Sequence, residues 1–426
     1  MKTNEWLYNL QETATPDIDE CVEVLGGDLD WLLRFKATEQ DPEWHAEGDV
    51  HIHTGMVLDE LYLLLRDEAH HIQGWRRQAL ILGVILHDIA KLVRTKRMDI
   101  QGIERVVAPQ HEAYGRSYLT FKLMALELPF LVIWTVLNLV GEHHMPKRLT
   151  VRNSTRADYW KLARQSDTEL LYWLEVADMR GRTCPDLKKQ LEYLDEFRLF
   201  AEEYEVWGKS LEVRSVIIDQ IGKLPVSMQD YVYAGALYEL EKGKINMPEE
   251  AIATTYQHRE EHPHLVILCG PSGSGKSSWI AEHYPDYDLV SLDELRQQFN
   301  GDRSSQDNRG QILQHAKELL KVALRAKRGV VWDATNLRTD FRSVIATLGR
   351  DYHALVSLVA FLLPEKQLYS SNRNRKYSVP NSVLLRQLES YQLPLLSEAH
   401  QYQVVGEGGK TLFRSGYFQE VENGYC

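Results

Sequence analysis

A glycine-rich segment in the second half of the chain has the spacing of a phosphate-binding loop. The apolar stretch 265–269 (LVILC) leads directly into residues 270–278, which read GPSGSGKSS. Glycines let such a backbone curl, so that successive amide groups point at phosphate oxygens near the start of a helix. Lys276 is placed to reach the β- and γ-phosphates of ATP or another nucleoside triphosphate, and Ser277 to bind Mg²⁺. The residues predicted to bind the nucleotide are Gly270, Ser272, Gly273, Ser274, Gly275, Lys276, Ser277 and Ser278.

The first half of the chain carries histidines and aspartates that suit a metal site. His87 and Asp88 are adjacent at the end of the apolar run 79–86 (ALILGVIL), where ionisable groups are costly unless they are paired or coordinated. Further candidate ligands are His53, His111, His143 and Asp178. Imidazole and carboxylate ligands without a thiolate favour a hydrated divalent ion such as Mn²⁺, Fe²⁺, Co²⁺ or Ni²⁺ over a closed structural zinc site. Such an ion can activate water for attack on a phosphate ester.

These six residues, in their order along the chain, resemble the ligand set of the HD phosphohydrolase superfamily. They lie in the segments HIHTGMVLDEL, ILHDIAK, APQHEAYG, LVGEHH and LEVADMRGR. One or two ions are expected. A first ion would be bound by His53, His87, Asp88 and Asp178, and a second by His111, His143 and a bridging Asp88.

Several neighbours of the candidate ligands leave alternatives open. His144 competes with His143 for the same ligand position. Lys91 follows His87 by one helical turn, and it either contacts a substrate phosphate, supports the ligands, or is a water-exposed lysine at a helix end. The residues interpreted as lying outside the ligand set are Arg180, Arg182, His45, His51, His70 and His71.

Two carboxylates follow apolar runs in the second half. Asp293 comes after DLVSL, and Asp333 ends GVVWD. Ligands bind at the carboxyl ends of parallel strands in open α/β sheets, so both are candidate site residues. Asp293 can act as a general base towards an attacking hydroxyl, while Arg296, three residues later, neutralises phosphate charge. The alternative is a helix-capping aspartate followed by a surface arginine.

The segment 370–380 (SSNRNRKYSVP) supplies closely spaced arginines after a predicted strand. Arg373 and Arg375 are both candidates for a lid that closes over the triphosphate and stabilises transition-state charge. The spacing does not decide which of the two contacts the donor phosphates.

The order GxxxxGKSS, DxxR, DATN and RNR…VP, over about residues 263–405, resembles the 5′-hydroxyl polynucleotide kinase family. The resemblance implies that Lys276 and Ser277 bind the donor and the metal. It also implies that Asp293 is the general base, that Arg296 contacts the acceptor-side phosphate and that Asp333 orients it.

A histidine–aspartate unit followed by a polynucleotide-kinase-like unit resembles the bacterial HD-kinase fusions of RNA repair. The resemblance implies an enzyme that acts on broken RNA ends, or DNA ends, phosphorylating a 5′-OH and removing a 2′, 3′ or 2′,3′-cyclic phosphate before a separate RNA ligase seals the strand. Two alternatives belong to other classes. One is a kinase of small nucleosides or metabolites joined to a nucleotide phosphohydrolase, and the other is a metal-bound scaffold that only docks RNA ends.

Length and composition fit a multidomain protein. The chain has 426 residues, a formal net charge of −12, 44% hydrophobic residues and four widely spaced cysteines. The negative charge argues against non-specific coating of polynucleotides but leaves room for local recognition of an end. The chain shows no signal pattern and no membrane-length apolar run, and we expect a cytoplasmic protein that binds no membrane.

The pattern of apolar residues predicts three regions. Residues 1–186 are expected to form an all-α HD phosphohydrolase domain, because their apolar residues recur at helical spacing. Residues 187–257 stay helical but become more polar, as expected of a helical connector. In residues 258–426, apolar strands alternate with helices, which predicts an α/β P-loop kinase domain with a parallel sheet.

Overall fold

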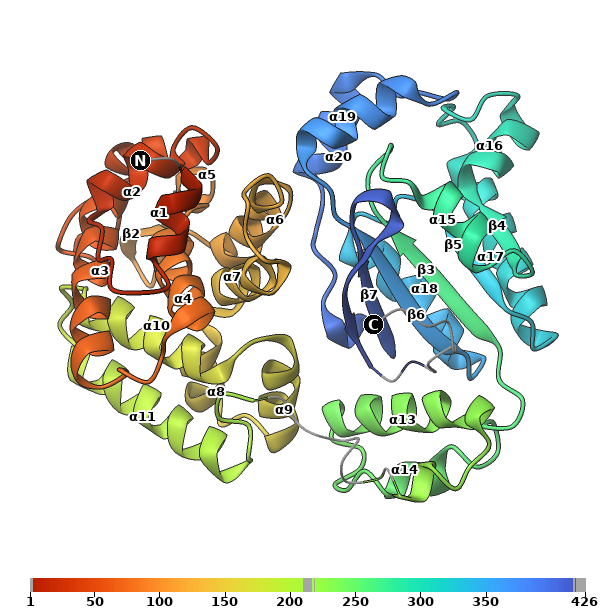
Figure 1. Cartoon of the computed structure of the whole chain (residues 1–426), viewed down its shortest axis with the longest axis horizontal. Coiled ribbons are helices and arrows are strands. Elements are labelled where there is room, and N and C mark those ends of the chain that lie inside the picture. Colours follow the sequence, from red (N-terminus) through yellow and green to blue (C-terminus); the bar gives the residue numbers. More distant parts are fainter. Residues whose placement is uncertain (1–2, 210–216, 218, 417, 419–426) are drawn as a thin grey trace. The chain divides into compact units, whose positions relative to one another are not determined.

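The computed structural model describes the chain except for residues 1–2, 210–216, 218, 417 and 419–426. It forms two compact units, residues 1–211 and residues 212–426, which we call the helical unit and the α/β unit (Figure 1). The division between them falls inside the segment predicted as a connector. The first helix of that segment, α11 (Leu187–Glu203), packs on α8 and α10 of the helical unit. The later helices α13 and α14 lie in the α/β unit.

The described helices of the helical unit surround a largely apolar core. In chain order they are α1 (Thr3–Asn9), α2 (Ile18–Leu25), the 3₁₀ helix η1 (Asp30–Ala37), α3 (Val50–Asp67), α4 (Gly74–Leu86), α5 (Lys91–Arg94), α6 (His111–Leu123), α7 (Phe130–Glu142), α8 (Met145–Val151), α9 (Arg156–Gln165), α10 (Thr168–Arg180) and α11. No helix in the described part of the chain has both the length and the apolar character needed to cross a membrane.

Helix α4 is the core of the helical unit, because α3, α7 and α10 all pack against it. Its residues 77–86 are buried on every side, which explains why the run ALILGVIL shows no polar face. A side chain at Gly83 would come within 2.9 Å of Leu139 Cδ1, so glycine permits the close approach of α4 to α7. The two helices therefore end side by side, and the residues that follow them, His87 and His143, are brought together.

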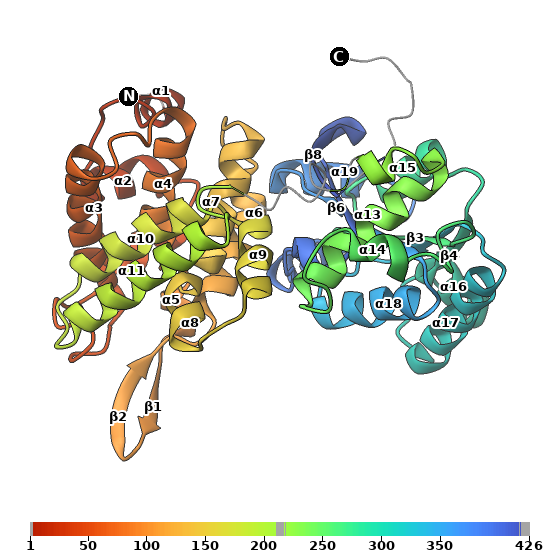
Figure 2. The same ribbon diagram turned by 90° about the horizontal axis from the view of Figure 1, so that it is seen from below.

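One feature departs from the predicted all-α architecture. Strands β1 (Lys96–Ile100) and β2 (Ile103–Val107) form an antiparallel hairpin that projects from the helices of its unit (Figure 2). Its turn residues Gln101 and Gly102 have φ angles of 56° and 82°, as a tight two-residue hairpin turn requires. The sequence prediction missed this hairpin because β1 is exposed along its whole length and carries no buried apolar face.

The α/β unit contains a six-stranded sheet in the order β4-β5-β3-β6-β7-β8. Its strands are β3 (His264–Cys269), β4 (Asp288–Ser291), β5 (Val330–Asp333), β6 (Leu355–Phe361), β7 (Gln401–Val405) and β8 (Thr411–Ser415). Its helices are α13 (Val226–Glu241), α14 (Glu250–Thr254), α15 (Lys276–His283), α16 (Leu292–Asn300), α17 (Arg309–Arg325), α18 (Thr339–Asp351), α19 (Glu365–Asn374) and α20 (Asn381–Glu389), with 3₁₀ turns η2 (Leu396–Glu398) and η3 (Glu407–Gly409).

The predicted parallel sheet is confirmed for its first five strands, since β3 to β7 all pair in parallel. The sequence did not indicate β7, and the edge strand β8 pairs with it antiparallel. β3 lies between β5 and β6: the chain runs from β3 to β4 and β5 on one side and then crosses to β6 on the other. Such a reversal of strand order opens a crevice at the carboxyl edge, where α/β proteins bind ligands.

Candidate functional site

The six histidines and aspartates predicted as metal ligands come together in the helical unit, and we call this group the His–Asp cluster. Its members are His53 on α3, His87 and Asp88 after α4, His111 at the start of α6, His143 after α7 and Asp178 on α10. His53 Nε2 lies 3.0 Å from Asp178 Oδ1, and His87 Nε2 lies 3.2 Å from Asp88 Oδ2. His111 Nε2 lies 3.0 Å from Asp88 Oδ1. Asp88 therefore lies between the two ligand groups predicted from the sequence.

Three of the imidazoles are oriented by the same type of hydrogen bond to the backbone. His87 and His143 directly follow a helix, and His111 is the first residue of one. In each of them Nδ1–H donates to the carbonyl oxygen three residues earlier, at 2.7 Å for His87 and 2.8 Å for His111 and His143. A carbonyl only accepts, so Nδ1 carries the proton and the lone pair remains on Nε2. Hydrogen bonds of this kind fix the tautomer and the ring orientation of metal-binding histidines.

Two inward-facing nitrogens of the cluster, Nε2 of His53 and of His87, form no hydrogen bond within the described chain. Both side chains are buried. A buried polar atom without a partner is costly and calls for a bound group. Both His53 and His87, with Asp88, have ligand atoms close enough to hold one ion. Imidazole and carboxylate donors without a thiolate thus fit a divalent transition metal.

The charges around the cluster favour a cation. Burial by itself raises the pKa of Asp88, but His87 and Lys91 hold that pKa well below its ordinary value. Burial also opposes ionisation of Asp178, and Arg182 holds its pKa well below the ordinary value. Burial and the neighbouring His111 lower the pKa of His143, which keeps its imidazole neutral, the form that binds metals.

Lys91 and Arg182 pair directly with the carboxylates of the cluster. Lys91 Nζ lies 2.7 Å from Asp88 Oδ2 and donates to Gln40 Oε1 at 2.6 Å. Lys91 is buried, so the alternative of a water-exposed lysine at a helix end is wrong. Arg182 donates to both oxygens of Asp178, at 2.9 and 2.7 Å. Arg182 therefore positions a predicted ligand, while Arg180 pairs with the exposed Glu68 and does not.

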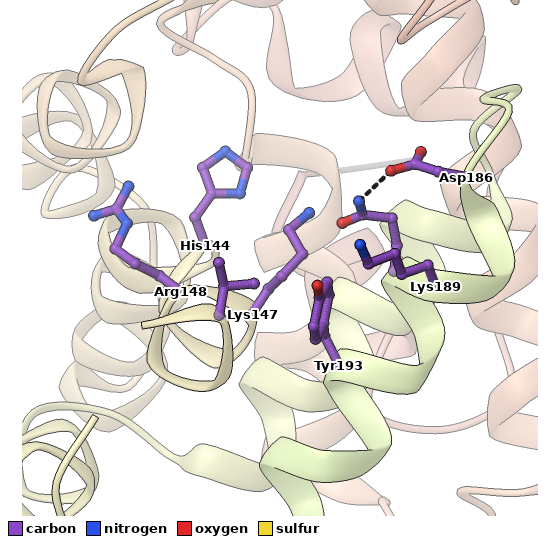
Figure 3. Close-up of a pocket in the computed structure, with 8 residues that line it drawn as sticks. His144, Lys147, Arg148, Asp186, Lys189 and Tyr193 are labelled. Carbon is purple, nitrogen blue, oxygen red and sulfur yellow. Dashed lines mark hydrogen bonds between the residues drawn. The ribbon is translucent and has the colours of Figure 1, made fainter. Parts of the chain in front are cut away.

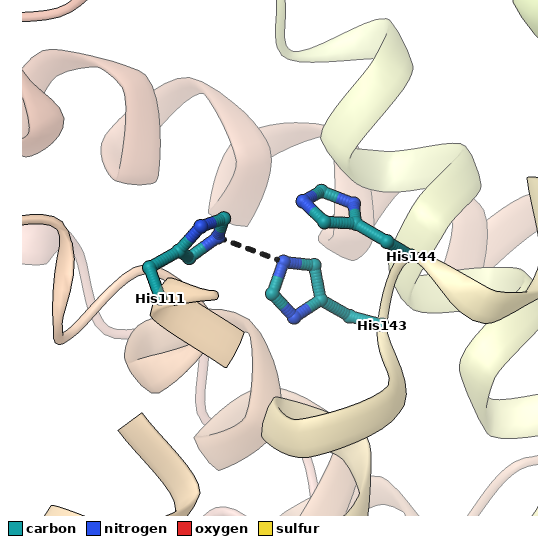
Figure 4. Close-up of side chains that lie close together, drawn as sticks. All are labelled: His111, His143 and His144. Carbon is teal, nitrogen blue, oxygen red and sulfur yellow. Dashed lines mark hydrogen bonds between the residues drawn. The ribbon is translucent and has the colours of Figure 1, made fainter. Parts of the chain in front are cut away.

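His144 stays near the cluster but has a different partner. Its ring centroid is 4.0 Å from that of His143, and the Nε2 atoms of His111 and His143 lie 3.3 Å apart (Figure 4). His144 Nδ1 instead lies 3.1 Å from Glu175 Oε1. Burial raises the pKa of Glu175 to about 7. His111, His143 and His144 also have ligand atoms close enough for one ion, so the structure leaves both adjacent histidines as ligand candidates.

The sequence analysis missed Glu47, which holds His53. Glu47 Oε1 lies 2.9 Å from His53 Nδ1 and 2.9 Å from His45 Nδ1, and its other oxygen accepts from the backbone N–H of Thr183 at 3.0 Å. Burial opposes ionisation of Glu47, but the two imidazoles hold its pKa below the ordinary value. His45, interpreted as an ordinary histidine, thus shares a carboxylate with a predicted ligand. No local pattern identified Glu47, because only the fold brings it to His53.

The glycine-rich loop of the α/β unit has the backbone geometry of a phosphate cradle. Gly273 and Gly275 have φ angles of 84° and 89°, which favour glycine, and α15 begins directly at Lys276. Lys276 Nζ donates to the carbonyl oxygens of Gly270 and Pro271 at 2.9 and 2.8 Å. Those bonds hold the lysine side chain across the loop. From there its ammonium group can exchange the carbonyl oxygens for phosphate oxygens as hydrogen-bond acceptors. Ser277 and Ser278 are exposed at the start of the helix.

Two residues outside the glycine-rich motif hold the loop in place. Asn336, in a left-handed conformation with φ of 48°, donates through Nδ2 to the carbonyl of Leu268 at 2.6 Å. Gln387 on α20 accepts from the backbone N–H of Ser272 at 2.8 Å. The sequence analysis assigned a role to neither, because each acts on the loop from a distant segment.

Both predicted carboxylates interact electrostatically with Lys276. Asp333 ends β5 and accepts from Ser291 Oγ at 3.1 Å, and burial raises its pKa. Burial lowers the pKa of Lys276, while the charges of Asp333 and Asp293 oppose that change. Asp293 lies in the first turn of α16 and pairs with Arg296. A helix-capping aspartate followed by a surface arginine would form the same ion pair.

The candidate lid arginines differ in their surroundings. Arg373 is exposed on α19, whereas Arg375 follows the helix, is half-buried and lowers the pKa of Lys276 through its charge. Asn372 holds the segment by donating to Val379 O at 2.7 Å and accepting from Val379 N at 3.0 Å. Of the two, Arg375 is therefore the arginine whose charge acts on Lys276.

Comparison with known proteins supports the interpretation of the α/β unit. Residues 265–394 match the family model of an AAA domain. This match, together with the strand–loop–helix geometry of 265–283, identifies a P-loop kinase-like domain that implies a nucleotide with Mg²⁺. A search of curated proteins found no match to the chain.

Proposed function

We propose that this protein is a bifunctional enzyme that heals broken nucleic-acid ends. Its α/β unit phosphorylates a 5′-OH polynucleotide end with a nucleoside triphosphate, and its helical unit removes a 2′, 3′ or 2′,3′-cyclic phosphate from an RNA end. The observation that carries the proposal is the His–Asp cluster itself, six residues from five segments whose side chains converge in a buried site on the same chain as a kinase-like domain.

The helical unit is proposed as the phosphohydrolase. A bound divalent metal supplies the activation of water and the polarisation of the phosphate. The imidazoles of His53, His87, His111 and His143 and the carboxylates of Asp88 and Asp178 hold one or two such ions. Lys91, paired with Asp88, offers an ammonium group to the phosphate that enters the site. Because every imidazole is already oriented, little reorganisation accompanies metal binding.

The α/β unit is proposed as the kinase. The backbone of 270–275 and Lys276 bind the donor phosphates, Ser277 holds Mg²⁺, and Arg375 rather than Arg373 stabilises the transferring phosphoryl group. Asp293 accepts the proton of the attacking hydroxyl. Arg296 contacts the phosphate on the acceptor side, and Asp333 orients that phosphate.

The test uses an end-labelled RNA with a 5′-OH and a 2′,3′-cyclic phosphate, incubated with the protein, a nucleoside triphosphate and each divalent metal in turn. The proposal expects a 5′-phosphate and an opened or removed cyclic phosphate. If free nucleosides are phosphorylated in preference to oligonucleotides and the cyclic phosphate stays intact under every metal, the protein is instead a small-molecule kinase joined to a nucleotide phosphohydrolase. If only the 5′ end changes, the helical unit acts as a binding scaffold.

A further inference from the structure

A pocket of about 490 Å³ lies beside the His–Asp cluster within the helical unit. Helices α8 and α11 form its two walls. The side chains labelled in Figure 3 are His144, Lys147, Arg148, Asp186, Lys189 and Tyr193. Lys147 from α8 and Lys189 and Tyr193 from α11 project into the space between the helices (Figure 3). None of these residues except His144 was considered for the ligand set.

The pocket has an excess of positive charge in a chain whose net charge is −12. Lys147, Arg148 and Lys189 line the pocket together with one carboxylate, Asp186, which accepts from Gln190 at 2.5 Å. Arg148 is paired with Glu112, at 3.3 Å, so the excess charge is that of the two lysines. In the described chain neither Lys147 nor Lys189 forms a salt bridge. Lys147 donates to the sulfur of Met179 at 3.6 Å, and its charge opposes the rise that burial causes in the pKa of Glu175. Two ammonium groups that form no salt bridge suit an anionic ligand such as phosphate.

Tyr193 gives the pocket an aromatic face. Its ring is half-buried against α8, and Lys189 Nζ lies 5.7 Å from its centroid. Any of the nucleobases can stack on such a ring, while nearby cations bind the sugar–phosphate backbone. The pocket therefore pairs the two features by which proteins bind single-stranded nucleic acid.

The position of the pocket relates it to the proposed phosphohydrolase. His144 lines the pocket, and its ring lies 4.0 Å from His143 and 5.2 Å from His111 by centroid distance. We propose that the pocket binds the penultimate nucleotide of the substrate strand, with its base on Tyr193 and its phosphate between Lys147 and Lys189, while the terminal phosphate reaches the His–Asp cluster. This inference rests on the proposed phosphohydrolase activity and deepens it by assigning a site for the strand.

The experiment compares two substrates in the full-length protein: an oligonucleotide ending in a 2′,3′-cyclic phosphate and a mononucleoside 2′,3′-cyclic phosphate, which has no penultimate nucleotide. The double variant Lys189→Ala/Tyr193→Ala should raise KM for the oligonucleotide about 10-fold or more, with kcat and the mononucleoside kinetics unchanged. Lys188→Ala, one residue away and 93% exposed, is the matched control and should leave both substrates unaffected. Equal KM values for wild type and the double variant would overturn the assignment.

A binding measurement keeps the inference separate from the proposed activity. Fluorescence anisotropy of a labelled oligonucleotide with a phosphorylated 5′ end, which is no kinase acceptor, should show a Kd about 10-fold higher for Lys189→Glu than for wild type. Because Lys189 is an exposed residue of α11, this substitution leaves the helix packing intact. If wild type hydrolyses neither substrate, the proposed phosphohydrolase fails, and the anisotropy still decides the pocket: an unchanged Kd contradicts it.

Discussion

The two candidate sites differ in what forms them: side chains from distant segments form one, and the backbone of consecutive residues forms the other. The His–Asp cluster is made of side chains spread over residues 53–178, all buried and each held by a hydrogen bond or an ion pair. The phosphate-binding loop is made mainly of the backbone of a few consecutive residues, with its serines exposed. A buried cluster of this kind depends on every side chain, because removal of one leaves charged neighbours without partners. A backbone cradle depends instead on the conformations that its glycines permit.

The largest expected effects come from removing one central residue of each site. Asp88→Ala takes away the carboxylate shared by His87, His111 and Lys91, so metal binding and phosphohydrolase activity should fall below detection while kinase activity remains. Lys276→Ala should lower the kinase rate by at least 10² to 10³ and leave the phosphohydrolase intact. Metal content and both activities, measured on each folded variant, check this pair. Loss of both activities in either variant would contradict two separate sites.

A somewhat smaller effect is expected from the proposed base of the kinase. Asp293→Asn keeps the size of the side chain and removes its ability to take a proton, so the rate should fall by about 10² to 10⁴. Nucleotide affinity should stay the same, since the donor phosphates are bound by the loop. Single-turnover kinetics with a separate nucleotide titration make the measurement. Near-normal turnover would identify Asp293 as a helix cap paired with Arg296.

Glu47 tests whether the cluster depends on its supporting contacts. Glu47→Gln weakens the hold on His53 and should lower metal affinity about 10- to 100-fold, the usual cost of losing a partner of a metal-binding histidine. Calorimetric metal titration measures it. Glu43→Gln is the control, because Glu43 is 54% exposed and pairs with Arg105 away from His53. Equal metal affinities for the two variants would show that metal binding does not depend on the contact between Glu47 and His53.

The smallest effect tests the backbone cradle. Alanine at Gly273 would adopt a φ of 84° with its Cβ 3.0 Å from both Asn372 N and Leu368 O. Such strain costs about 1 to 3 kcal/mol, so KM for the nucleotide should rise roughly 10-fold. Gly310→Ala lies in α17 with open space around it and should change nothing. A normal KM for Gly273→Ala would mean that the loop does not require this conformation.

The sequence predicted the features that depend on local pattern. Strands β3 to β6 were recognisable as short apolar runs, because a sheet buried on both faces leaves no polar alternation. The phosphate-binding loop was recognisable because all its chemistry lies in consecutive residues. The six residues of the His–Asp cluster were predicted through their order along the chain, and the structure brings them together.

The features that the sequence did not predict depend on contacts between distant segments. Glu47 acts on His53 only after α3 and the preceding loop have folded, and Gln387 reaches Ser272 from more than a hundred residues away. The hairpin β1–β2 is stabilised by its turn and by the ion pair of Arg105 with Asp41, and its exposed strands lack the usual apolar alternation. Local pattern therefore predicted the candidate reacting groups better than the residues that contact and position them.

The most direct test of the central claim asks whether one chain prepares both ends of a broken RNA. A nicked RNA with a 5′-OH and a 2′,3′-cyclic phosphate is treated with protein, nucleoside triphosphate and divalent metal, and then offered to a separate RNA ligase. Wild type should make the nick sealable, Lys276→Ala and Asp88→Ala should each fail alone, and the two variants mixed should restore sealing. A cyclic phosphate left intact by wild type under every divalent metal would contradict the account.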